Sequence, residues 1–182
     1  MKRLFSPWRS KYISSFRHES GDHSCLFCSV AASKKDAEHL VLIRRDTCYV
    51  IMNLYPYNNG HVMVVPYRHT SSLKELTRKE HAEIMATTSM MIEALTSVMN
   101  PHGFNLGANL GRAAGAGIDQ HIHFHVVPRW NGDTNFMPTL GDTKLVSEDL
   151  RKSYKKLRAA IGSIPVKKKK LPRRRRDAER GI

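Results

Sequence analysis

Residues 119–130 read DQHIHFHVVPRW, and this stretch decides the fold of the chain. Three histidines alternate with isoleucine, phenylalanine and valine, which favour a pleated strand. The pattern predicts that His121, His123 and His125 share one face of a strand at spacings of about 6–7 Å, while the apolar residues between them pack in a core. Pro128 has no backbone N–H to donate, so regular strand pairing is expected to end there.

A row of three imidazoles on a rigid strand has three interpretations. A neutral imidazole, with an unperturbed pKa of about 6.5, can attack an electrophile while its neighbours donate hydrogen bonds to charge that develops on a phosphate or carbonyl. Alternate histidines can also converge on a zinc ion, as in a metal-dependent hydrolase. The third interpretation is a surface strand whose polar face has no function.

The spacing His-φ-His-φ-His-φ-φ, where φ is apolar, is followed by Pro128 and Arg129 and resembles the signature of the histidine triad (HIT) family of nucleotide hydrolases and transferases. The resemblance implies an α+β fold with an antiparallel sheet of about five strands, one long helix and a C-terminal helix. It also implies a homodimer. In the implied mechanism, His123 attacks the α-phosphorus of an adenine nucleotide or dinucleoside polyphosphate and forms a nucleotidyl-histidine intermediate. His125 stabilises phosphate oxygens or the leaving group, and His121 holds the site in position, without a catalytic metal or an organic cofactor.

Length and composition indicate one globular domain with extensions. The chain has 182 residues, of which 41% are hydrophobic and 25% are charged, as is usual for soluble domains. No run approaches the roughly 18–20 apolar residues of a membrane span, and the start of the chain is too polar after Phe5 for a secretory signal. Three cysteines do not make a disulfide framework. We therefore expect a cytoplasmic protein.

The basic charge is concentrated near the C-terminal end. The formal net charge is +14, and residues 163–182 hold nine basic and two acidic side chains, a net +7. Such a segment cannot bury apolar surface and is predicted to be disordered. It either attracts nucleic acid or another polyanion or is a solvated tail without a dedicated partner. The chain thus divides into an N-terminal arm (1–24), a HIT domain (25–138), a C-terminal helical extension (139–162) and the basic tail.

Cys25 and Cys28 form a Cys-x-x-Cys motif, which occurs in zinc sites, in redox proteins and where two cysteines are simply buried. A zinc site needs two more ligands. The family resemblance implies that these are His69, in the sequence PYRH, and His121, which would make a closed and therefore structural Cys₂His₂ site. In the alternative, His121 only orients the neighbouring histidines. Upstream, the sequence PWR at residues 7–9 resembles the leader of HIT proteins related to diadenosine tetraphosphate phosphorylases.

A β-hairpin is predicted ahead of the long helix. Residues 47–53 (TCYVIMN) and 61–66 (HVMVVP) have strand composition, and an Asn-Gly pair between them favours a turn. Cys48 is expected in the core. By resemblance, Asn53 contacts the nucleoside sugar and His61 lies beside the phosphates. The alternative is an ordinary hairpin with polar ends.

Two helices are predicted. The sequence TRKE at residues 77–80 is a capping box, and it begins a long helix that ends at Asn100-Pro101. An apolar stripe of this helix is expected to pack on the sheet: Ile84, Met91, Leu95 and Val98, widened by Met85, Ile92 and Met99. A second helix is predicted at residues 147–161, with an apolar stripe of Leu150, Tyr154, Leu157 and Ile161.

The segment before the three histidines is predicted to bind phosphate. Residues 104–110 indicate a strand, and the small-residue loop 111–117 lets backbone N–H groups approach phosphate oxygens closely. A flexible glycine-rich loop without function is the alternative. The candidate substrate-binding residues of this region and of the segment after the histidines are Asn109, Gly115, Gly117 and Trp130. Trp130, like Phe136, either stacks on a base or anchors packing.

The expected function is cleavage of a phosphoanhydride or related bond in a dinucleoside polyphosphate or adenine nucleotide derivative. One alternative is a diadenosine tetraphosphate phosphorylase, in which phosphate is the acceptor. Another is a non-enzymatic module that binds nucleotide or nucleic acid. Many HIT proteins have Gln or Ser where this chain has Gly117, so this position does not separate a hydrolase from a phosphorylase.

Overall fold

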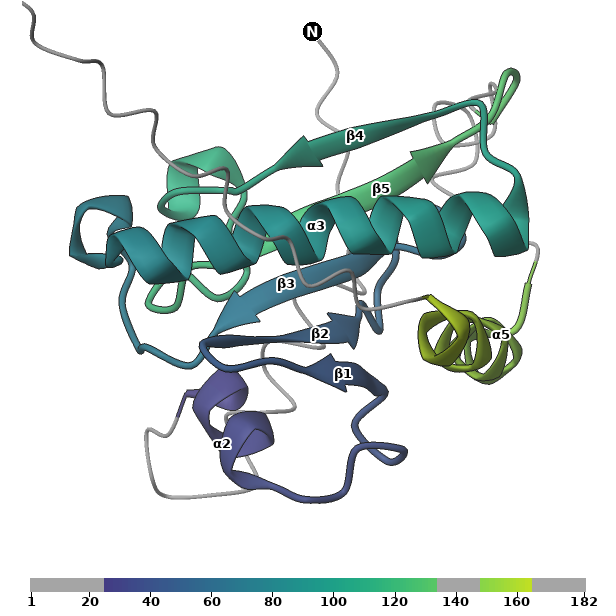
Figure 1. The fold of residues 1–182 in the computed structure, drawn as a ribbon. Coiled ribbons are helices and arrows are strands. Elements are labelled where there is room, and N and C mark those ends of the chain that lie inside the picture. Colours follow the sequence, from purple (N-terminus) through teal and green to yellow (C-terminus); the bar gives the residue numbers. More distant parts are fainter. Residues whose placement is uncertain (1–24, 134–147, 165–182) are drawn as a thin grey trace, which may run out of the picture.

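The computed structural model describes residues 25–133 and 148–164, and Figure 1 shows its fold. In these ranges the chain forms a five-stranded antiparallel sheet of order β1-β2-β3-β5-β4. The strands are β1 (Val41–Arg44), β2 (Cys48–Met52), β3 (Val62–Pro66), β4 (Gly103–Gly107) and β5 (Phe124–Arg129). The helices are α2 (Leu26–Ala32), α3 (Arg78–Met99) and α5 (Leu150–Ser163), with short 3₁₀ turns η1 (Leu73–Glu75) and η2 (Arg112–Ala114). The predicted α+β fold is confirmed.

Several predictions lie outside the described residues. These are the N-terminal arm at 1–24, the segment 134–147, which contains Phe136, and residues 165–182 of the basic tail. The structure therefore bears on the HIT-like domain and on the helical part of the extension. Within the described ranges, no helix is both long enough and apolar enough to cross a membrane.

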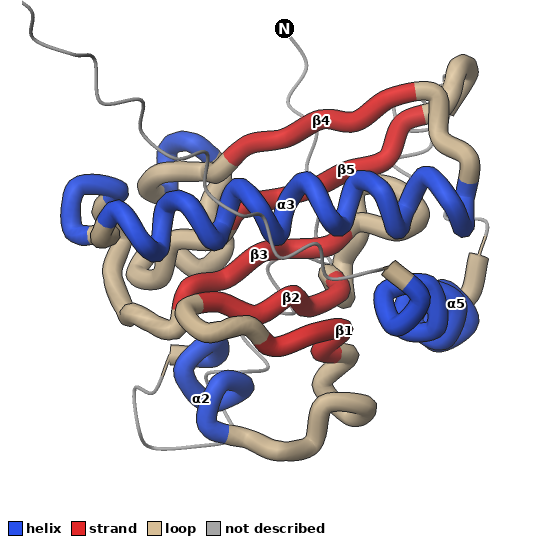
Figure 2. The backbone as a smooth tube through the Cα atoms, viewed as in Figure 1, coloured by secondary structure: helices blue, strands red, loops and turns tan. Residues whose placement is uncertain are grey.

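The two faces of the sheet belong to two different apolar clusters, and the helices divide between them (Figures 1 and 2). α3 and α5 pack with one face, in a cluster that includes Leu42, Val50, Val64, Met91, Leu95, Val126 and Leu157. α2 packs with the other face, in a cluster of Phe27, Val30, Val41, Tyr49, Ile51, Met63 and Val65. Because β2 and β3 are covered on both faces, every residue of these two strands is buried.

The predicted hairpin is confirmed. β2 and β3 pair in register from Cys48 with Pro66 to Met52 with Val62, and Cys48 is fully buried. In the connecting turn, Gly60 has a φ of +70°, and a Cβ atom built there would lie 2.6 Å from the sulfur of Met99. The positive φ favours glycine at this position, and any larger residue would also have to displace the Met99 side chain of α3.

The predicted capping box begins α3. The Thr77 hydroxyl accepts a hydrogen bond from the Glu80 N–H (3.2 Å), and the Glu80 carboxylate accepts one from the Thr77 N–H (2.6 Å). The helix ends at Asn100, whose φ of 45° is left-handed, as is common after the last helical turn. The sequence therefore predicted both ends of α3.

The predicted apolar stripes of α3 and α5 pack in the core, with one exception. The buried members are Ile84, Met91, Leu95, Tyr154, Leu157 and Ile161, and the partly buried members are Ile92, Val98, Met99 and Leu150. Met85 is 57% exposed, so its assignment to the stripe is wrong. It lies about 100° around the helix from Ile84, which turns it towards solvent.

Three strand predictions are corrected. Pro128 does not end pairing, because it lies opposite Phe104 of β4. The register pairs β3 with β5 only from Phe124 to Val126, so a missing N–H at Pro128 removes no bond to β3. β4 ends at Gly107 rather than at residue 110. Finally, β1 was not predicted, because its four residues show no alternation of apolar and polar side chains.

The capping box makes a contribution to stability that is lost in acid. The hydrogen bond from the Thr77 N–H, together with one from Arg68 Nε (3.0 Å), lowers the pKa of Glu80. A lowered pKa means that this stabilisation is complete above about pH 4.5 and is lost as the pH falls through the folded-state pKa. We expect Glu80→Gln to lower the free energy of unfolding by about 1 kcal/mol at neutral pH and to cost progressively less in acid.

Urea unfolding of both proteins at neutral pH and at about pH 3.5 measures this difference. Glu93→Gln is the matched control, because Glu93 is exposed on the same helix and should matter little at either pH. A cost of Glu80→Gln that stays constant or grows as the pH falls contradicts the assignment.

Candidate functional site

The histidine row serves two neighbouring sites. His123 and His125 line a pocket, whereas His121 lies beside Cys25 and Cys28. All three histidines are buried. β5 begins only at Phe124, so the prediction that one strand carries all three is wrong: His121 and His123 precede the regular strand. The residues between them do pack in the core as expected: Ile122, Phe124 and Val126.

A backbone contact fixes the tautomer of His123. Its Nδ1 atom lies 2.9 Å from the carbonyl oxygen of His121. A carbonyl oxygen can only accept, so Nδ1 carries the proton and donates it. Burial lowers the pKa of His123, which favours the neutral ring. The neutral ring therefore has its lone pair on Nε2, and His123 is part of the pocket wall.

A second chain of contacts orients the proton of His125. The Tyr57 N–H donates to Nδ1 of His61 (3.0 Å), and Nε2 of His61 lies 2.9 Å from Nδ1 of His125. Because Nδ1 of His61 accepts, the proton of neutral His61 is on Nε2 and is donated to His125. A neutral His125 then carries its own proton on Nε2. The ring centroids of His125 and His123 lie 4.8 Å apart, so His125 supplies an N–H donor in the ring next to His123.

The pocket has a volume of about 200 Å³ and walls of different character. A polar end lies at the histidines and is formed by Asn109, Gly115, Gly117, His123 and His125. An apolar end is formed by residues of α2 and by residues in and after β2: Leu26, Val30, Ile51 and Leu54. Phe27 of α2 joins the two ends, because its ring centroid lies 4.9 Å from that of His123. Glu38 and His39, just before β1, also line the pocket. Because the strand order is β1-β2-β3-β5, the pocket runs across the sheet from β5 towards β1.

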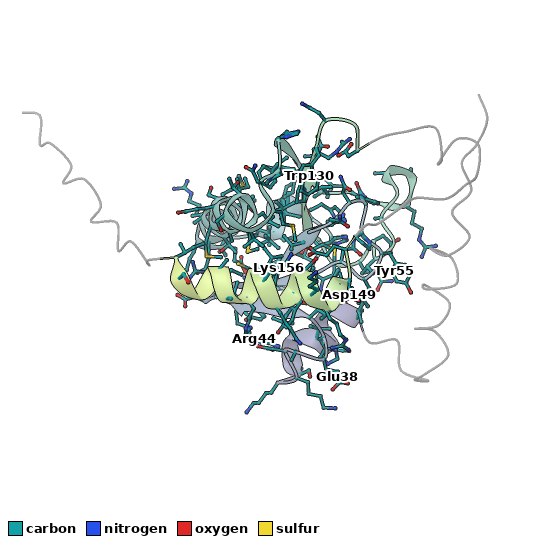
Figure 3. The ribbon with its side chains drawn as sticks, turned by 90° about the vertical axis from the view of Figure 1, so that its right-hand side faces the viewer. Glu38, Arg44, Tyr55, Trp130, Asp149 and Lys156 are labelled. Atoms are coloured by element: carbon teal, nitrogen blue, oxygen red, sulfur yellow. The ribbon has the colours of Figure 1, made fainter. Side chains whose placement is uncertain are left out.

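Most of the predicted substrate-binding residues come together at this pocket. Asn53 lines it, as do the three predicted residues of the loop before the histidines. In that loop Gly115 has a φ of +86°, which favours glycine. His61 lies behind His125 rather than in the wall. Trp130 is not in the wall either, and in Figure 3 Trp130 and Glu38 lie towards opposite ends of the molecule.

An ion pair closes the loop that carries Gly115 and Gly117. Arg112 Nε lies 2.7 Å from a carboxylate oxygen of Asp119, and this contact lowers the pKa of Asp119. The pair joins the start of the loop to the residue that follows it, so the glycines between are held as a compact turn. Such a turn can present backbone N–H groups to an anion.

Four residues form a cluster that could hold a metal ion: Cys25, Cys28, His69 and His121, whose ligand atoms all lie within 4.8 Å of one another. The Cys25 sulfur is 3.3 Å from Nδ1 of His121, and the Cys28 sulfur is 3.3 Å from Nδ1 of His69. These separations are close to those between ligands of a tetrahedral zinc ion with bonds of about 2.0–2.3 Å.

The tautomer of His121 also fits a metal ligand. Its Nε2 atom lies 2.9 Å from the Pro66 carbonyl oxygen, so Nε2 carries the proton and the lone pair of Nδ1 faces the two sulfurs. Metal-bound histidines commonly donate their other N–H to a carbonyl in this way. Among the described residues, the cluster includes His121 but neither His123 nor His125. The geometry thus gives no support to a catalytic metal held by all three histidines.

Sequence reasoning missed the apolar wall and Tyr57. Phe27 and Val30 are one helical turn apart, but α2 has only seven residues, too few for a clear periodic signal. Glu38 belongs to an irregular segment without a pattern. Tyr57 acts through its backbone N–H, which no side-chain motif reveals, although its ring also stacks on His61 at 4.8 Å.

Comparisons with known proteins agree with this geometry. A family model described as the HIT domain matches residues 34–132. An AP-4-A phosphorylase from Mycobacterium tuberculosis (strain ATCC 25618 / H37Rv) is 42% identical over 155 residues, which cover 83% of this chain and 80% of that protein. The adenosine 5'-monophosphoramidase hnt1 of Schizosaccharomyces pombe is 29% identical over 108 residues, which cover 59% and 76%.

Among solved structures, a zinc-bound histidine triad family protein from Mycobacterium smegmatis is similar, with a TM-score of 0.62 and 29% identity over 76% of this chain and 94% of that chain. The family match contains the pocket histidines, the glycine-rich loop and the hairpin that carries Asn53 and His61. On its sequence and on its fold, the chain belongs to the HIT domain family.

Proposed function

We propose that this protein transfers a nucleotidyl group from a dinucleoside polyphosphate or a related adenine nucleotide first to His123 and then to water or phosphate. One observation carries the proposal. The hydrogen bond from Nδ1 of His123 to the His121 carbonyl leaves the lone pair of Nε2 available in a residue that lines the pocket. A neutral imidazole in this state needs no base to activate it as a nucleophile.

The reaction has two steps. In the first, Nε2 of His123 forms a bond to the α-phosphorus while the bond to the bridging oxygen breaks. His125 donates a hydrogen bond from its Nε2–H to the leaving phosphate oxygen, and the His121 carbonyl stabilises the positive charge on the substituted ring. In the second step, an oxygen of water or phosphate displaces His123, the P–N bond breaks and leaves the His123 ring neutral, and the proton of an attacking water passes to solvent.

The two ends of the pocket suit the two parts of a nucleotide. The glycine-rich end would receive the phosphates, because backbone N–H groups there can face oxygen anions. The apolar end would receive the base. Asn53 lines the pocket and accepts a hydrogen bond from the Tyr55 N–H (2.9 Å), and we propose that it contacts the sugar. Asn109 completes the polar end. Trp130 lies outside the wall, so we assign it no contact with the base.

The named relatives support an enzyme of this kind over a module that only binds. One is called an AP-4-A phosphorylase and another an adenosine 5'-monophosphoramidase. The 42% identity to the phosphorylase makes phosphate the second candidate acceptor. With diadenosine tetraphosphate as substrate, water yields AMP and ATP, whereas phosphate yields ADP and ATP. Products of reactions run with and without phosphate therefore separate the two functions.

We also propose that the four-residue cluster binds a structural zinc ion. Two cysteines and two histidines supply four ligands and leave no open position for substrate. Zinc would tie α2, which carries Cys28, to His69 after β3 and to His121 before β5. A cytoplasmic location agrees with this site, because thiols stay reduced in the cytoplasm. Fractionation of cells would test the location.

Two interactions with other molecules belong to the proposal. A homodimer could form through β4, which is an edge strand with Leu106 50% exposed. Sedimentation as a monomer at micromolar concentration would contradict the proposed dimer.

The basic tail at 163–182 is proposed to bind nucleic acid or another polyanion. Deleting it should leave turnover nearly unchanged and weaken RNA binding in low salt.

The nucleophile can be tested by substitution. We expect His123→Ala to lower kcat by at least about 10⁴-fold, because it removes the atom that attacks phosphorus. AMP binding should weaken only a few-fold, since His123 is one of many groups around the ligand. The rate of diadenosine tetraphosphate cleavage gives kcat, and calorimetric titration with AMP gives the Kd. His81→Ala is the control, because His81 is exposed on α3. Turnover near the wild-type rate in His123→Ala would refute the mechanism.

The zinc site can be tested by metal content. We expect wild-type protein to hold one zinc ion per chain. Cys28→Ser should lose most of the zinc, because it removes one of the two thiolate ligands. A chelator should lower the Tm of the wild type and change that of Cys28→Ser little. Cys48→Ala, at the third cysteine, should keep its zinc. A chelated protein that remains folded but has no activity would instead indicate a catalytic metal.

A further inference from the structure

We propose that Arg44 is a positioning residue for the apolar end of the pocket, and that it sets the affinity for the nucleoside part of the substrate without taking part in the chemical step. The inference rests on the proposed function, because it concerns one end of the same pocket. Four observations support it: the contacts of Arg44, a bulge in β1, the support of that bulge by α5, and the shortness of α2.

The Arg44 guanidinium binds the C-terminal end of α2. Nη1 donates to the carbonyl of Ala31 (2.8 Å), and Nη2 donates to the carbonyls of Val30 (3.0 Å) and Ser33 (2.6 Å). The last carbonyls of a helix have no partner within the helix, and α2 has no basic residue in its last turn. Arg44 therefore supplies from the sheet the donors and the positive charge that favour this helix end.

The same side chain holds the segment that follows α2. Nε of Arg44 lies 2.9 Å from a carboxylate oxygen of Asp36, two residues before Glu38. Glu38 and His39 belong to the pocket wall, as do Phe27 and Val30 of α2. One guanidinium thus contacts Val30 of the wall directly and, through Asp36, holds the segment that leads to Glu38 and His39.

A bulge in β1 directs Arg44 towards α2. Val41 lies opposite Ile51, but Ile43 lies opposite Val50, so the register shifts by one residue between them. In a regular strand, residues 41 and 44 would point to opposite faces. Because of the shift, Arg44 lies opposite Tyr49, and Val41 and Tyr49 both belong to the α2 cluster. Bulges re-aim side chains in this way, often beside functional sites.

Helix α5 supports the bulge. Arg158 donates to the carbonyls of Leu42 (2.8 Å) and Val41 (3.1 Å), and the Tyr154 hydroxyl donates to the carbonyl of Val41 (3.2 Å). α5 lies outside the part of the chain that the family model matches, residues 34–132. An element beyond the matched domain therefore stabilises the strand geometry that directs Arg44.

α2 needs such external contacts because it is short. An isolated helix of seven residues is unstable in water. Of the metal cluster, Cys25 is the N-cap residue of α2 and Cys28 lies in its first turn, and its C-terminal end, with the C-cap Ser33, carries the carbonyls that Arg44 binds. Without Arg44, the C-terminal part of α2 would be free to move, and part of the binding free energy would be spent on ordering it. Phe27 of α2 contacts His123, with ring centroids 4.9 Å apart, but it lies in the first turn beside Cys28 of the metal cluster, so the His123 end would be least affected.

Ligands that fill different ends of the pocket test this. We expect Arg44→Gln to raise the Kd for AMP by about tenfold or more, with a matching rise in KM for diadenosine tetraphosphate. kcat, zinc content and the inhibition constant of inorganic tripolyphosphate, which has no nucleoside, should stay within about twofold. Arg44→Lys keeps the positive charge and should recover part of the affinity for AMP. If Arg44→Gln does not fold, Arg44→Lys is measured in its place. Arg158→Gln should show the same pattern more weakly.

Arg45→Gln is the matched control, because the neighbouring Arg45 side chain contacts Met90 of α3 and should leave every value near that of the wild type. Unchanged AMP affinity in Arg44→Gln overturns the inference. Equal weakening of AMP and tripolyphosphate, or a fall in kcat at constant KM, also overturns it. The AMP titration does not depend on turnover, so a wild-type protein without activity would refute the proposed function and not this inference.

Discussion

The hydrogen bond from Nδ1 of His123 to the backbone carbonyl of His121 is the contact on which the site depends. It sets the tautomer of His123 and so decides which nitrogen carries the lone pair. The side chain of His121 is held in turn by the Pro66 carbonyl and faces the two cysteines. His121 therefore serves the pocket through its backbone and the metal cluster through its side chain. A structural ion in this cluster would maintain the geometry of the nucleophile without touching the substrate.

Under the proposed function, different parts of the pocket serve the chemical step at phosphorus and the affinity for the nucleoside. Groups around β5 and His61 control proton positions and would act on phosphorus in any nucleotide. Groups on α2 and before β1 form the apolar end, and they are held by Arg44 and by the bulge that α5 supports. Changes in the second set can alter which nucleosides bind while the first set stays intact.

The sequence predicted the parts of the fold that have strong local signals. The β2–β3 hairpin and the capping box at Thr77 each combine a pattern with specific chemistry, and each is present in the structure. The alternating histidines predicted the buried apolar residues Ile122 and Val126 but not the start of β5, which excludes His121 and His123. β1 and α2 were missed because four and seven residues carry too little periodicity. The role of Arg44 depends on a one-residue register shift, which arises from packing and cannot be read from composition. Tyr57 was missed because its backbone N–H makes the contact to His61.

The stereochemical course at phosphorus tests the central claim, which is a covalent nucleotidyl-histidine intermediate, most directly. The substrate would be a dinucleoside polyphosphate whose α-phosphorus is made chiral by sulfur, cleaved in water enriched in heavy oxygen. Two successive in-line displacements, first by His123 and then by water, each invert the configuration. We therefore expect net retention in the nucleoside thiophosphate product. Net inversion would mean that water attacks the substrate directly, and it would contradict the role assigned to His123.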